Sequence, residues 1–279
     1  MAGHVTNKSV IVTGAGGGFG RLTSERLAAL GARLTCADVN GEAAEATAAA
    51  IREAGGQAIA VGADVAKIED MRAVAQAAVE AYGAIDVLVN NAGTMPLAFL
   101  ADHENAYAAW SRCIDINFKG VMNGVVAVHD QMIAQGRGHV VNVSSIYGNF
   151  ATAGAAIYGA TKAAVDYFSG ALRHESRGKI KVTVVKPTGV PGTGLGSTVV
   201  NPMASSGIVG QNVGEFYADL QRMKGPDAAQ GGALDPEDIG YLILAPEHIA
   251  DAIVHVIDQP WGVSISDVTV RASADHYVR

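Results

Sequence analysis

The chain has 279 residues, of which 49% are hydrophobic, and it carries a formal net charge of −7. A chain of this length and composition can bury one large core, so we expect a single domain over residues 1–279. The acidic balance argues against a nucleic-acid surface, which needs clustered Lys and Arg side chains.

The sequence also argues against a membrane protein and a disulfide-rich one. No run approaches the 18 apolar residues of a membrane span, and the first residues lack the apolar centre of a signal peptide. Cys36 and Cys113 are the only cysteines and lie far apart, so we expect two buried, reduced thiols. This pattern favours a cytoplasmic location.

The first predicted strand and helix are joined by a turn that is nearly all glycine. The β-branched run at residues 10–12 is typical of a strand buried on both faces, and from Leu22 the apolar residues recur with a helical period. Between them, residues 14–20 read Gly-Ala-Gly-Gly-Gly-Phe-Gly. Glycines let the backbone approach a ligand closely, and the free N–H groups of the first helical turn attract an anion. A tight turn without a ligand fits this loop equally well when it is taken alone.

Asp38 turns the glycine-rich loop into a dinucleotide signature. It ends the next apolar run, residues 33–38, about 20 residues after the glycines. An acidic group at this place can accept hydrogen bonds from the ribose hydroxyls of a bound dinucleotide. The two features together predict a dinucleotide site.

Strands and helices alternate along the rest of the chain. We expect helices at residues 41–54, 67–82, 157–177 and 246–259, two more within 105–135, and strands at 57–61, 85–89, 139–143, 179–185 and 267–270. Such alternation predicts βαβ units with right-handed crossovers. The expected fold class is α/β, a Rossmann-type doubly wound parallel sheet of about seven strands with helices on both faces.

The periodic pattern breaks down after the sixth predicted strand. From about residue 188 to residue 236, glycines, prolines and serines alternate with scattered apolar residues. A connection of this length inside a compact domain is usually disordered or a functional lid, and the apolar residues favour a lid. Residues 213–223 within it have a helical pattern.

Tyr158 and Lys162 form the most informative pair of reactive side chains. Four residues apart at the start of a predicted helix, they project from one face. A nearby cation favours the phenolate form of a tyrosine, so the pair suits proton transfer at an alcohol. An ordinary exposed pair has the same spacing, but this one follows a predicted strand end, where ligands bind in open parallel sheets.

With these motifs in place, the sequence resembles the short-chain dehydrogenases/reductases of the compact, single-domain branch. Its matching segments are Thr13-Gly-Ala-Gly-Gly-Gly-Phe-Gly20, Asn90-Asn-Ala-Gly93, Asn117 within Asp-Ile-Asn-Phe-Lys-Gly, Ser145, and Tyr158-Gly-Ala-Thr-Lys162. They occur in the family's order and cover essentially the whole chain.

The resemblance implies a role for each matching residue. Tyr158 would be the general acid/base, Ser145 would bond the substrate oxygen, Lys162 would hold the nicotinamide ribose and lower the tyrosine pKa, and Asn117 would position a water. Ser144 is a rival for the serine, and the spacing to Tyr158 favours Ser145. The implied cofactor-binding set is Gly14, Gly16, Gly17, Gly18, Phe19, Gly20, Asp38, Asp64, Val65, Asn91, Ala92, Gly93, Tyr158, Lys162, Pro187 and Val190.

Charge indicates which cofactor the site prefers. Asp38 would repel a 2′-phosphate, and its neighbours offer no compensating cation, so we expect NAD rather than NADP. The family's Pro-Gly after the sixth strand is Pro187-Thr188-Gly189-Val190 here, which makes the contact between Val190 and the carboxamide uncertain. The threonine expected a few residues later is Thr193 or is displaced.

Apolar residues around the site favour a neutral, hydrophobic secondary alcohol or ketone as substrate. They include Met95, Pro96, Leu97, Phe99, Ile146, Tyr147 and Phe150, with Arg222 and Lys224 among the few cations. An acidic substrate would call for a placed Arg or Lys. The same apolar residues also fit simple packing of the lid or a subunit interface.

Two other functions remain open. A 3-oxoacyl or keto-acid reductase would usually prefer NADP and so conflicts with Asp38, and a non-catalytic dinucleotide-binding regulator would not need the catalytic set. Sugar epimerases and dehydratases are disfavoured by the compact length and the glycine spacing.

The resemblance also implies a homotetramer or homodimer, built through the two long helices that flank the fifth strand. No metal site is expected, because the histidines show no ligand spacing and suit surface or packing roles. They are His4, His103, His129, His139, His174, His248, His255 and His276.

Overall fold

In the computed structural model, which describes residues 3–224 and 234–277, a seven-stranded sheet forms the centre of the molecule. Its strands are β1 (Ser9–Thr13), β2 (Arg33–Asp38), β3 (Gln57–Gly62), β4 (Val87–Asn90), β5 (Gly138–Val143), β6 (Ile180–Pro187) and β7 (Asp267–Val270). All pair in parallel, in the order β3-β2-β1-β4-β5-β6-β7. The predicted doubly wound parallel sheet is confirmed.

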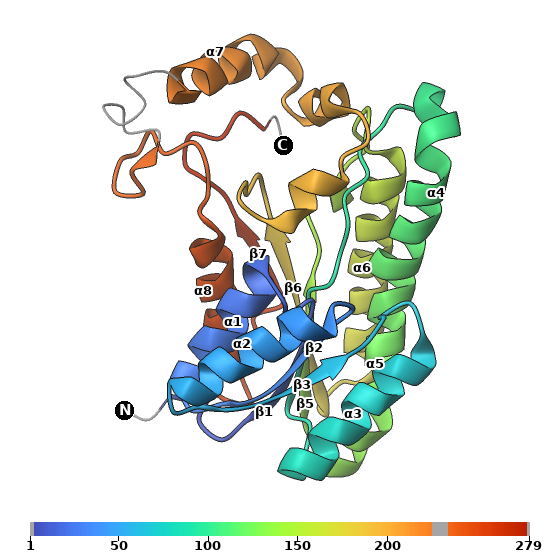
Figure 1. Ribbon diagram of the computed structural model, residues 1–279, viewed down its shortest axis with the longest axis vertical. Coiled ribbons are helices and arrows are strands. Elements are labelled where there is room, and N and C mark those ends of the chain that lie inside the picture. Colours follow the sequence, from blue (N-terminus) through green and yellow to red (C-terminus); the bar gives the residue numbers. More distant parts are fainter. Residues whose placement is uncertain (1–2, 225–233, 278–279) are drawn as a thin grey trace.

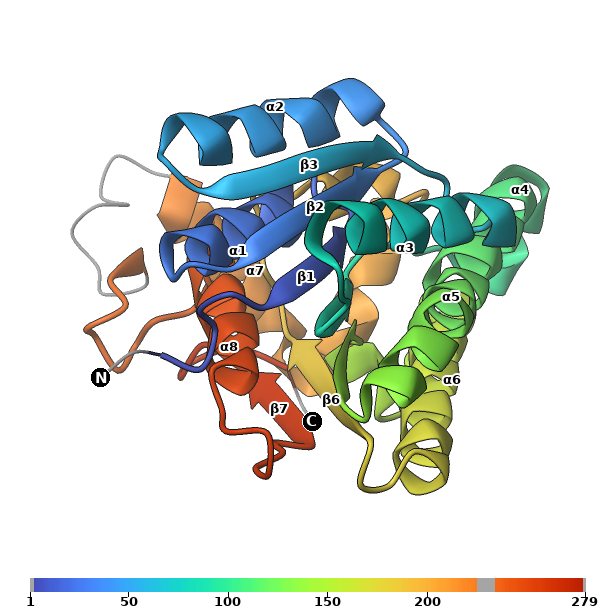
Figure 2. The ribbon, with the colours of Figure 1, turned by 90° about the horizontal axis from the view of Figure 1, so that it is seen from below.

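The helices cover both faces of this sheet (Figures 1 and 2). They are α1 (Gly18–Ala29), α2 (Gly41–Glu53), α3 (Ile68–Tyr82), α4 (His103–Ile114), α5 (Gly120–Gln135), α6 (Ala156–Glu175), α7 (Val213–Lys224) and α8 (Pro246–Ile257). Helices α1, α2 and α8 pack on one face, and α3, α5 and α6 pack on the other. Within the described residues, every helix is too short or too polar to span a lipid bilayer.

Alternating residues of β1 show how the sheet faces both layers. Val10 and Val12 belong to the core beneath α1 and α8, whereas Ile11 belongs to the core beneath α3 and α5. All three are at most 1% exposed, as the β-branched run predicted. The strand is buried on both faces, which fixes its register against β2 and β4.

The two helices expected within residues 105–135 form one uninterrupted helical run. Between α4 and α5 lies a π-helical turn, Asp115–Lys119, whose flanking residues keep right-handed helical dihedral angles. A π turn inserts one residue into the helix without breaking it, which a periodicity argument does not reveal. Asn117 lies within this turn and is buried.

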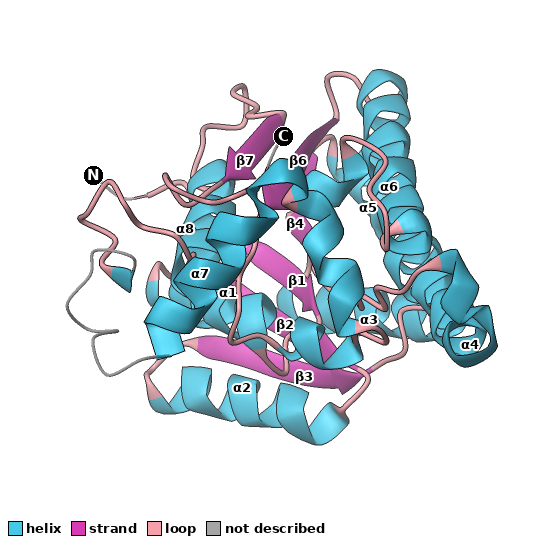
Figure 3. Ribbon diagram, turned by 90° about the horizontal axis from the view of Figure 1, so that it is seen from above, coloured by secondary structure: helices cyan, strands magenta, loops and turns pink. Residues whose placement is uncertain are grey.

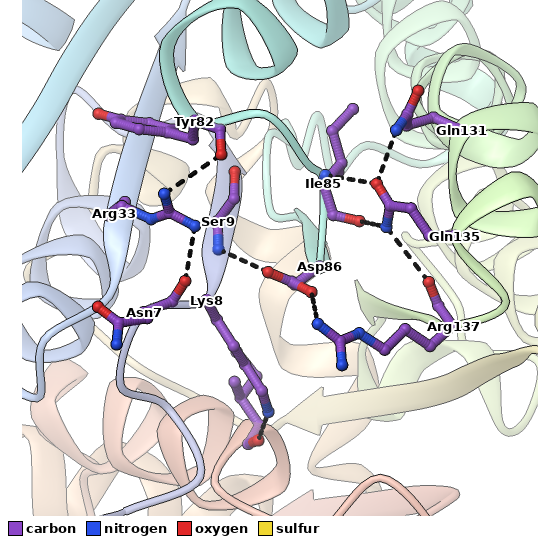
Figure 4. A network of polar contacts seen from close by, with 11 residues as sticks. Asn7, Lys8, Ser9, Arg33, Tyr82, Ile85, Asp86, Gln131, Gln135 and Arg137 are labelled. Carbon is purple, nitrogen blue, oxygen red and sulfur yellow. Dashed lines mark hydrogen bonds and ion pairs between the residues drawn. The ribbon is translucent and has the colours of Figure 1, made fainter.

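A hydrogen-bond network ties the amino ends of the strands together (Figure 4). Asp86 accepts from the N–H of Ser9 at 3.0 Å and lies 3.5 Å from the Arg137 guanidinium. The Gln135 amide bonds both main-chain groups of Ile85, at 2.9 Å each. The Gln135 bonds take the place of ladder pairing at Ile85, whereas the main chain of Asp86 bonds Ser9 and His139. β4 begins at Val87 rather than at the predicted residue 85.

The segment that follows β6 covers the carboxyl ends of the strands. Short 3-10 turns, Gly194–Thr198, Pro202–Ile208 and Gly210–Asn212, lead into α7, which lies above the carboxyl ends of the strands (Figures 1 and 3). The predicted helix at residues 213–223 is confirmed as α7. Residues 225–233 of the expected lid lie outside the described residues.

Candidate active site

The glycine-rich turn between β1 and α1 takes a shape that side chains would prevent. Gly14 and Gly18 have φ angles of +65° and +48°, in the left-handed region that glycine adopts readily. A Cβ on Gly20 would overlap the carbonyl of Gly14. Gly17 is the N-cap residue of α1 and has no side chain to cap the helix. A Cβ at this position would meet nothing within 4 Å. The backbone amides of the first helical turn are therefore open on this side.

Side chains at the end of β4 hold the glycine turn in place. The Asn91 amide donates to the carbonyls of Thr13 and Gly14, at 2.9 and 3.2 Å. The Thr13 hydroxyl accepts from the N–H groups of Asn91 and Ala92, at 3.0 and 3.1 Å. These bonds join β1 to β4 where the strand order reverses, which is the ligand-binding crevice of open α/β sheets.

Asp38 closes the same crevice from the end of β2. Its Oδ2 accepts from the N–H of Gly16 and its Oδ1 from the N–H of Asn40, each at 2.9 Å. A Cβ on Gly16 would come within 3.0 Å of this carboxylate. The carboxylate is thus fixed beside the glycine turn, where a ribose would approach it.

A cavity of about 640 Å³ extends along the carboxyl ends of the strands. Most of the predicted site residues line it, namely Gly14, Gly17, Gly18, Phe19, Asp38, Asn91, Ala92, Gly93, Ser145, Tyr158, Lys162, Pro187 and Val190. Five do not, namely Gly16, Gly20, Asp64, Val65 and Asn117. The fold therefore gathers residues from β1, β2, β4, β5, β6 and α6 around one space.

Tyr158, Ser145 and Lys162 meet inside this cavity. A hydrogen bond joins the Ser145 hydroxyl to the Tyr158 hydroxyl. Lys162, one helical turn after Tyr158, has its ammonium 5.8 Å from the tyrosine ring centre and donates to the Val143 carbonyl at 2.9 Å. All three side chains are nearly fully buried.

Burial sets the acidity of both reactive groups. It raises the pKa of Tyr158 to about 12, although the hydrogen bond with Ser145 lowers it in part. Burial lowers the pKa of Lys162 to about 8, since a low-dielectric interior disfavours the ammonium form. In this state of the protein, Tyr158 holds its proton at neutral pH.

The two neighbouring serines have different partners. Ser144 donates to the Lys162 carbonyl at 3.2 Å, a contact that fixes the start of α6 against β5. Ser145 accepts from the Tyr147 N–H at 3.3 Å and bonds Tyr158. Ser145, rather than Ser144, therefore faces the phenol.

Asn117 lies behind the cavity in the π-helical turn. Its side-chain amide donates to the Thr94 carbonyl and accepts from the Thr94 N–H, both at 2.9 Å. The same nitrogen lies 3.3 Å from the Cys113 sulfur and from the Thr161 hydroxyl. The side chain thus fixes the loop after β4, and it is 1% exposed.

Asp64 and Val65 lie beside the crevice rather than in it. Asp64 forms an ion pair with Arg112 at 3.0 Å, and the Val65 carbonyl accepts from the Asn123 amide at 2.8 Å. These contacts connect the end of β3 to α4 and α5.

The two threonines that the sequence left undecided both line the cavity. Thr188 replaces the glycine expected after Pro187, and its buried hydroxyl has no partner among the described residues. Thr193 lies next to the glycine turn, since a Cβ on Gly18 would be 3.6 Å from the Thr193 Cβ. An orphaned hydroxyl and an open helix amino end fit the polar groups of a dinucleotide.

Apart from Phe216, an apolar residue of the expected lid, the residues that close the far end of the cavity were not indicated by the sequence. They come from α7 and from the end of the described chain, and include Phe216, Asp219, Asp275, His276 and Tyr277. His276, for which a surface or packing role was expected, has its Nε2 2.8 Å from a carboxylate oxygen of Asp219 and lines the cavity. The side chains of Arg222 and Lys224 lie outside the described residues.

Comparison with known proteins identifies a family and several relatives. A model of the short chain dehydrogenase family matches residues 8–203. An uncharacterized oxidoreductase of Listeria monocytogenes, Lmo0432, is 34% identical over 269 residues, which are 95% of this chain and 96% of the relative. The 2,5-dichloro-2,5-cyclohexadiene-1,4-diol dehydrogenase LinX of Sphingobium indicum is 35% identical over 193 residues, which are 68% of this chain and 76% of the relative.

Solved structures show the same architecture. A short-chain dehydrogenase/reductase from Burkholderia phymatum in complex with NAD aligns with a TM-score of 0.74 and 27% identity, over 95% of this chain and 89% of that chain. A metagenomic short-chain oxidoreductase in complex with NADP aligns with a TM-score of 0.71 and 26% identity, over 96% and 98%. With the family model covering most of the chain and the fold and crevice in agreement, the protein belongs to the short-chain dehydrogenase/reductase family of oxidoreductases.

Proposed function

We propose that the chain is an NAD-dependent dehydrogenase that interconverts neutral, hydrophobic secondary alcohols and their ketones. The observation that carries this proposal is the buried Tyr158 hydroxyl, bonded to Ser145, with Lys162 one helical turn further on. Family membership supports hydride chemistry, and the cavity next to this cluster leads to the glycine turn.

Each residue of the cluster has a task that its position suits. Bound NAD would accept the hydride from the carbinol carbon. Ser145 would hold the substrate oxygen, and Tyr158 would remove the hydroxyl proton during oxidation and return it during reduction. Lys162 would hold the ribose and, with the positive charge of the oxidised ring, favour the phenolate against the effect of burial. Asn117 would position a water for proton exchange.

Asp38 supports NAD over NADP as the cofactor. Its carboxylate is fixed by two backbone N–H groups at the end of β2, where it can accept bonds from both free ribose hydroxyls. A 2′-phosphate would bring negative charge against it. The family relatives of known structure contain either NAD or NADP, so the local charge is the deciding argument here.

The lining of the cavity supports a neutral substrate. Met95, Leu97, Leu195, Leu242 and Ile243 contribute apolar surface. Among the described residues that line the space, Lys162 is the one Lys or Arg, and it is assigned to the ribose, so no cation is placed for a carboxylate or phosphate substrate. LinX, a relative whose name states a substrate, is a dehydrogenase of a chlorinated cyclohexadiene diol, an uncharged ring alcohol, in keeping with this class.

The proposal is tested by assaying a panel of secondary alcohols with NAD and with NADP, in wild type and Tyr158→Phe. We expect NAD to give at least tenfold higher kcat/KM, and Tyr158→Phe to lower kcat by about 10²–10⁴-fold while still binding NAD in calorimetry. Equal use of NAD and NADP would reject the role of Asp38. A protein that binds NAD but oxidises no alcohol would instead be a dinucleotide-binding regulator.

We further infer a homo-oligomer formed through α5 and α6, in a reducing, cytoplasmic environment. Both helices carry exposed apolar residues, among them Met122, Val126 and Tyr167. Cys36 and Cys113 are buried free thiols, and burial raises the pKa of each to about 11, which keeps them unreactive.

A further inference from the structure

The end of the described chain runs between α7 and the carboxyl ends of the strands (Figure 1), and several of its residues line the cavity. We call residues 271–277 the C-terminal strap. Asp275, His276 and Tyr277 of this strap line the cavity together with Asp219 of α7. The strap and α7 therefore close the side of the site where a substrate would lie.

Hydrogen bonds hold the strap in one conformation. Arg271 binds both carboxylate oxygens of Asp275, at 2.6 and 3.1 Å, and donates to the Tyr277 carbonyl at 2.9 Å. The Asn212 amide donates to the His276 carbonyl at 2.9 Å. The main chain on both sides of the His276 ring is thus fixed before any substrate arrives.

His276 and Asp219 form an ion pair inside the cavity wall. The two side chains are 12% and 11% exposed, and Nε2 lies 2.8 Å from Oδ2. The Phe216 ring meets the His276 ring edge-on at 5.9 Å. Apolar side chains could join α7 to the strap without the desolvation cost of a buried pair, so the pair suits recognition better than packing.

The second ring nitrogen of His276 is available to a ligand. A carboxylate only accepts hydrogen bonds, so a proton on Nε2 would face Asp219 across this 2.8 Å contact. No group of the described residues makes a hydrogen bond to Nδ1. This nitrogen accepts a bond when the ring is neutral and donates one when the ring is charged, and a hydroxyl can serve both states.

The wall of the cavity connects His276 to the reactive end. The Tyr147 ring meets the Tyr158 ring edge-on at 5.5 Å. Tyr147 also packs in one apolar cluster with Phe216 and Tyr277, the residues that flank His276. Because Tyr158 and His276 line the same cavity, a single substrate could place one hydroxyl at Tyr158 and a second at His276.

We propose that His276, oriented by Asp219, binds a second hydroxyl of the substrate, remote from the carbinol that reacts. The substrate class is then a hydrophobic diol rather than a monofunctional alcohol. This inference rests on the proposed alcohol dehydrogenase function and adds to it the group that selects among alcohols. A site built to bond a hydroxyl discriminates strongly against an analogue that lacks it.

The test compares two alcohols that share one ring, cyclohexanol and trans-cyclohexane-1,4-diol. Binding to Tyr158→Phe loaded with NAD is measured by calorimetry, and kcat/KM is measured with wild type. We expect the diol to bind at least tenfold more tightly and to react with at least tenfold higher kcat/KM. Equal binding of the two alcohols would overturn the inference, even if both were oxidised.

Variants of His276 and Asp219 distinguish recognition of the second hydroxyl from a purely structural contact between α7 and the strap. The paired change His276→Phe with Asp219→Leu avoids leaving one buried charge alone, and we expect it to remove the preference for the diol. If the pair were only a structural contact, the double variant would lower activity on both alcohols equally and keep the ratio of their kcat/KM values. That result would contradict the proposal. His248→Phe is the matched control, since the His248 ring meets the Tyr241 ring edge-on outside the cavity lining, and it should keep the ratio.

The outcomes also distinguish this inference from the proposed function. If wild type oxidises neither these two alcohols nor any other alcohol of the panel, the dehydrogenase assignment fails, and the calorimetric comparison still decides the role of His276. If both alcohols are oxidised at equal rates and bound equally, the dehydrogenase assignment stands and the diol inference fails.

Discussion

His139 lies on β5 with its ring 1% exposed, and its Nε2 is 2.9 Å from the Thr183 hydroxyl. Burial lowers the pKa of His139 to about 3, and the cations Lys181 and Lys8 lower it further. The folded protein therefore keeps this ring neutral under mildly acidic conditions in which the unfolded chain takes up a proton. The stability that the neutral ring provides is complete above about pH 6.5 and is lost as the pH falls towards 3.

We predict that His139→Gln weakens this acid sensitivity. Between pH 7 and pH 4.5, wild type should lose about 2 kcal/mol more unfolding free energy than the variant, because glutamine takes up no proton. Urea unfolding at the two pH values measures the difference. His129→Gln is the control, since His129 is not buried in the core. Equal losses in wild type and His139→Gln would contradict the assigned cause.

Single residues that act through local spacing could be predicted from sequence, whereas residues joined by the tertiary fold could not. Tyr158 and Lys162 are neighbours on one helix face, and Asp38 follows its strand directly. His276 and Asp219 meet only because the strap folds back beneath α7. No periodicity links two such distant positions, so a histidine of the strap could not be told from a surface one.

At the scale of elements, β6 and the strap meet at a point with no spare volume. A Cβ on Gly189, just after β6, would overlap the Tyr277 hydroxyl. That hydroxyl is buried, and burial raises the pKa of Tyr277 to about 12. The glycine is needed here for close approach rather than for an unusual φ angle.

We predict that Gly189→Ala pushes the strap away from β6. The change should cost about 1–3 kcal/mol of stability and raise KM for the alcohol, because the displaced strap carries part of the cavity wall. Thermal unfolding and steady-state kinetics measure both effects. Adding Tyr277→Phe removes the overlapping oxygen and should restore part of the loss, and strictly additive effects would argue against the overlap.

The helical run from α4 to α5 shows a limit of sequence periodicity. The helical pattern predicted two helices in this stretch but did not reveal the π turn at Asp115–Lys119, because one inserted residue shifts the apolar pattern without breaking the helix. The turn brings Asn117 to Thr94. The family motif, rather than the period, indicated that Asn117 matters.

At the scale of the whole molecule, the parallel sheet and its covering helices followed from the alternation of strand and helix patterns. The strand order did not, since it depends on which hydrophobic faces pair across the chain. The segment that covers the carboxyl ends of the strands was predicted only as a lid. Its short turns lack any period, and no sequence pattern indicated that the strap contributes to the same wall.

We predict that the surface formed by α5 and α6 mediates self-association. On α6 the exposed positions Ala156, Ala160, Ala163 and Tyr167 follow a helical spacing, and Val126 of α5 is 51% exposed. Wild type should sediment as a dimer or tetramer, and Val126→Lys with Tyr167→Lys should reduce the mass without changing the far-ultraviolet circular dichroism. Leu30→Lys, at an exposed apolar position after α1, is the control. Sedimentation of wild type as a monomer would reject this prediction.

The network at the amino ends of the strands has a practical consequence (Figure 4). It lies a full strand length, about 20 Å, from the cavity at the carboxyl ends of the strands. The cavity and this network thus lie on opposite sides of the molecule. A dye or a solid support attached near Arg137 would therefore not obstruct the cavity. This face of the molecule suits attachment when a sensor is built from the protein.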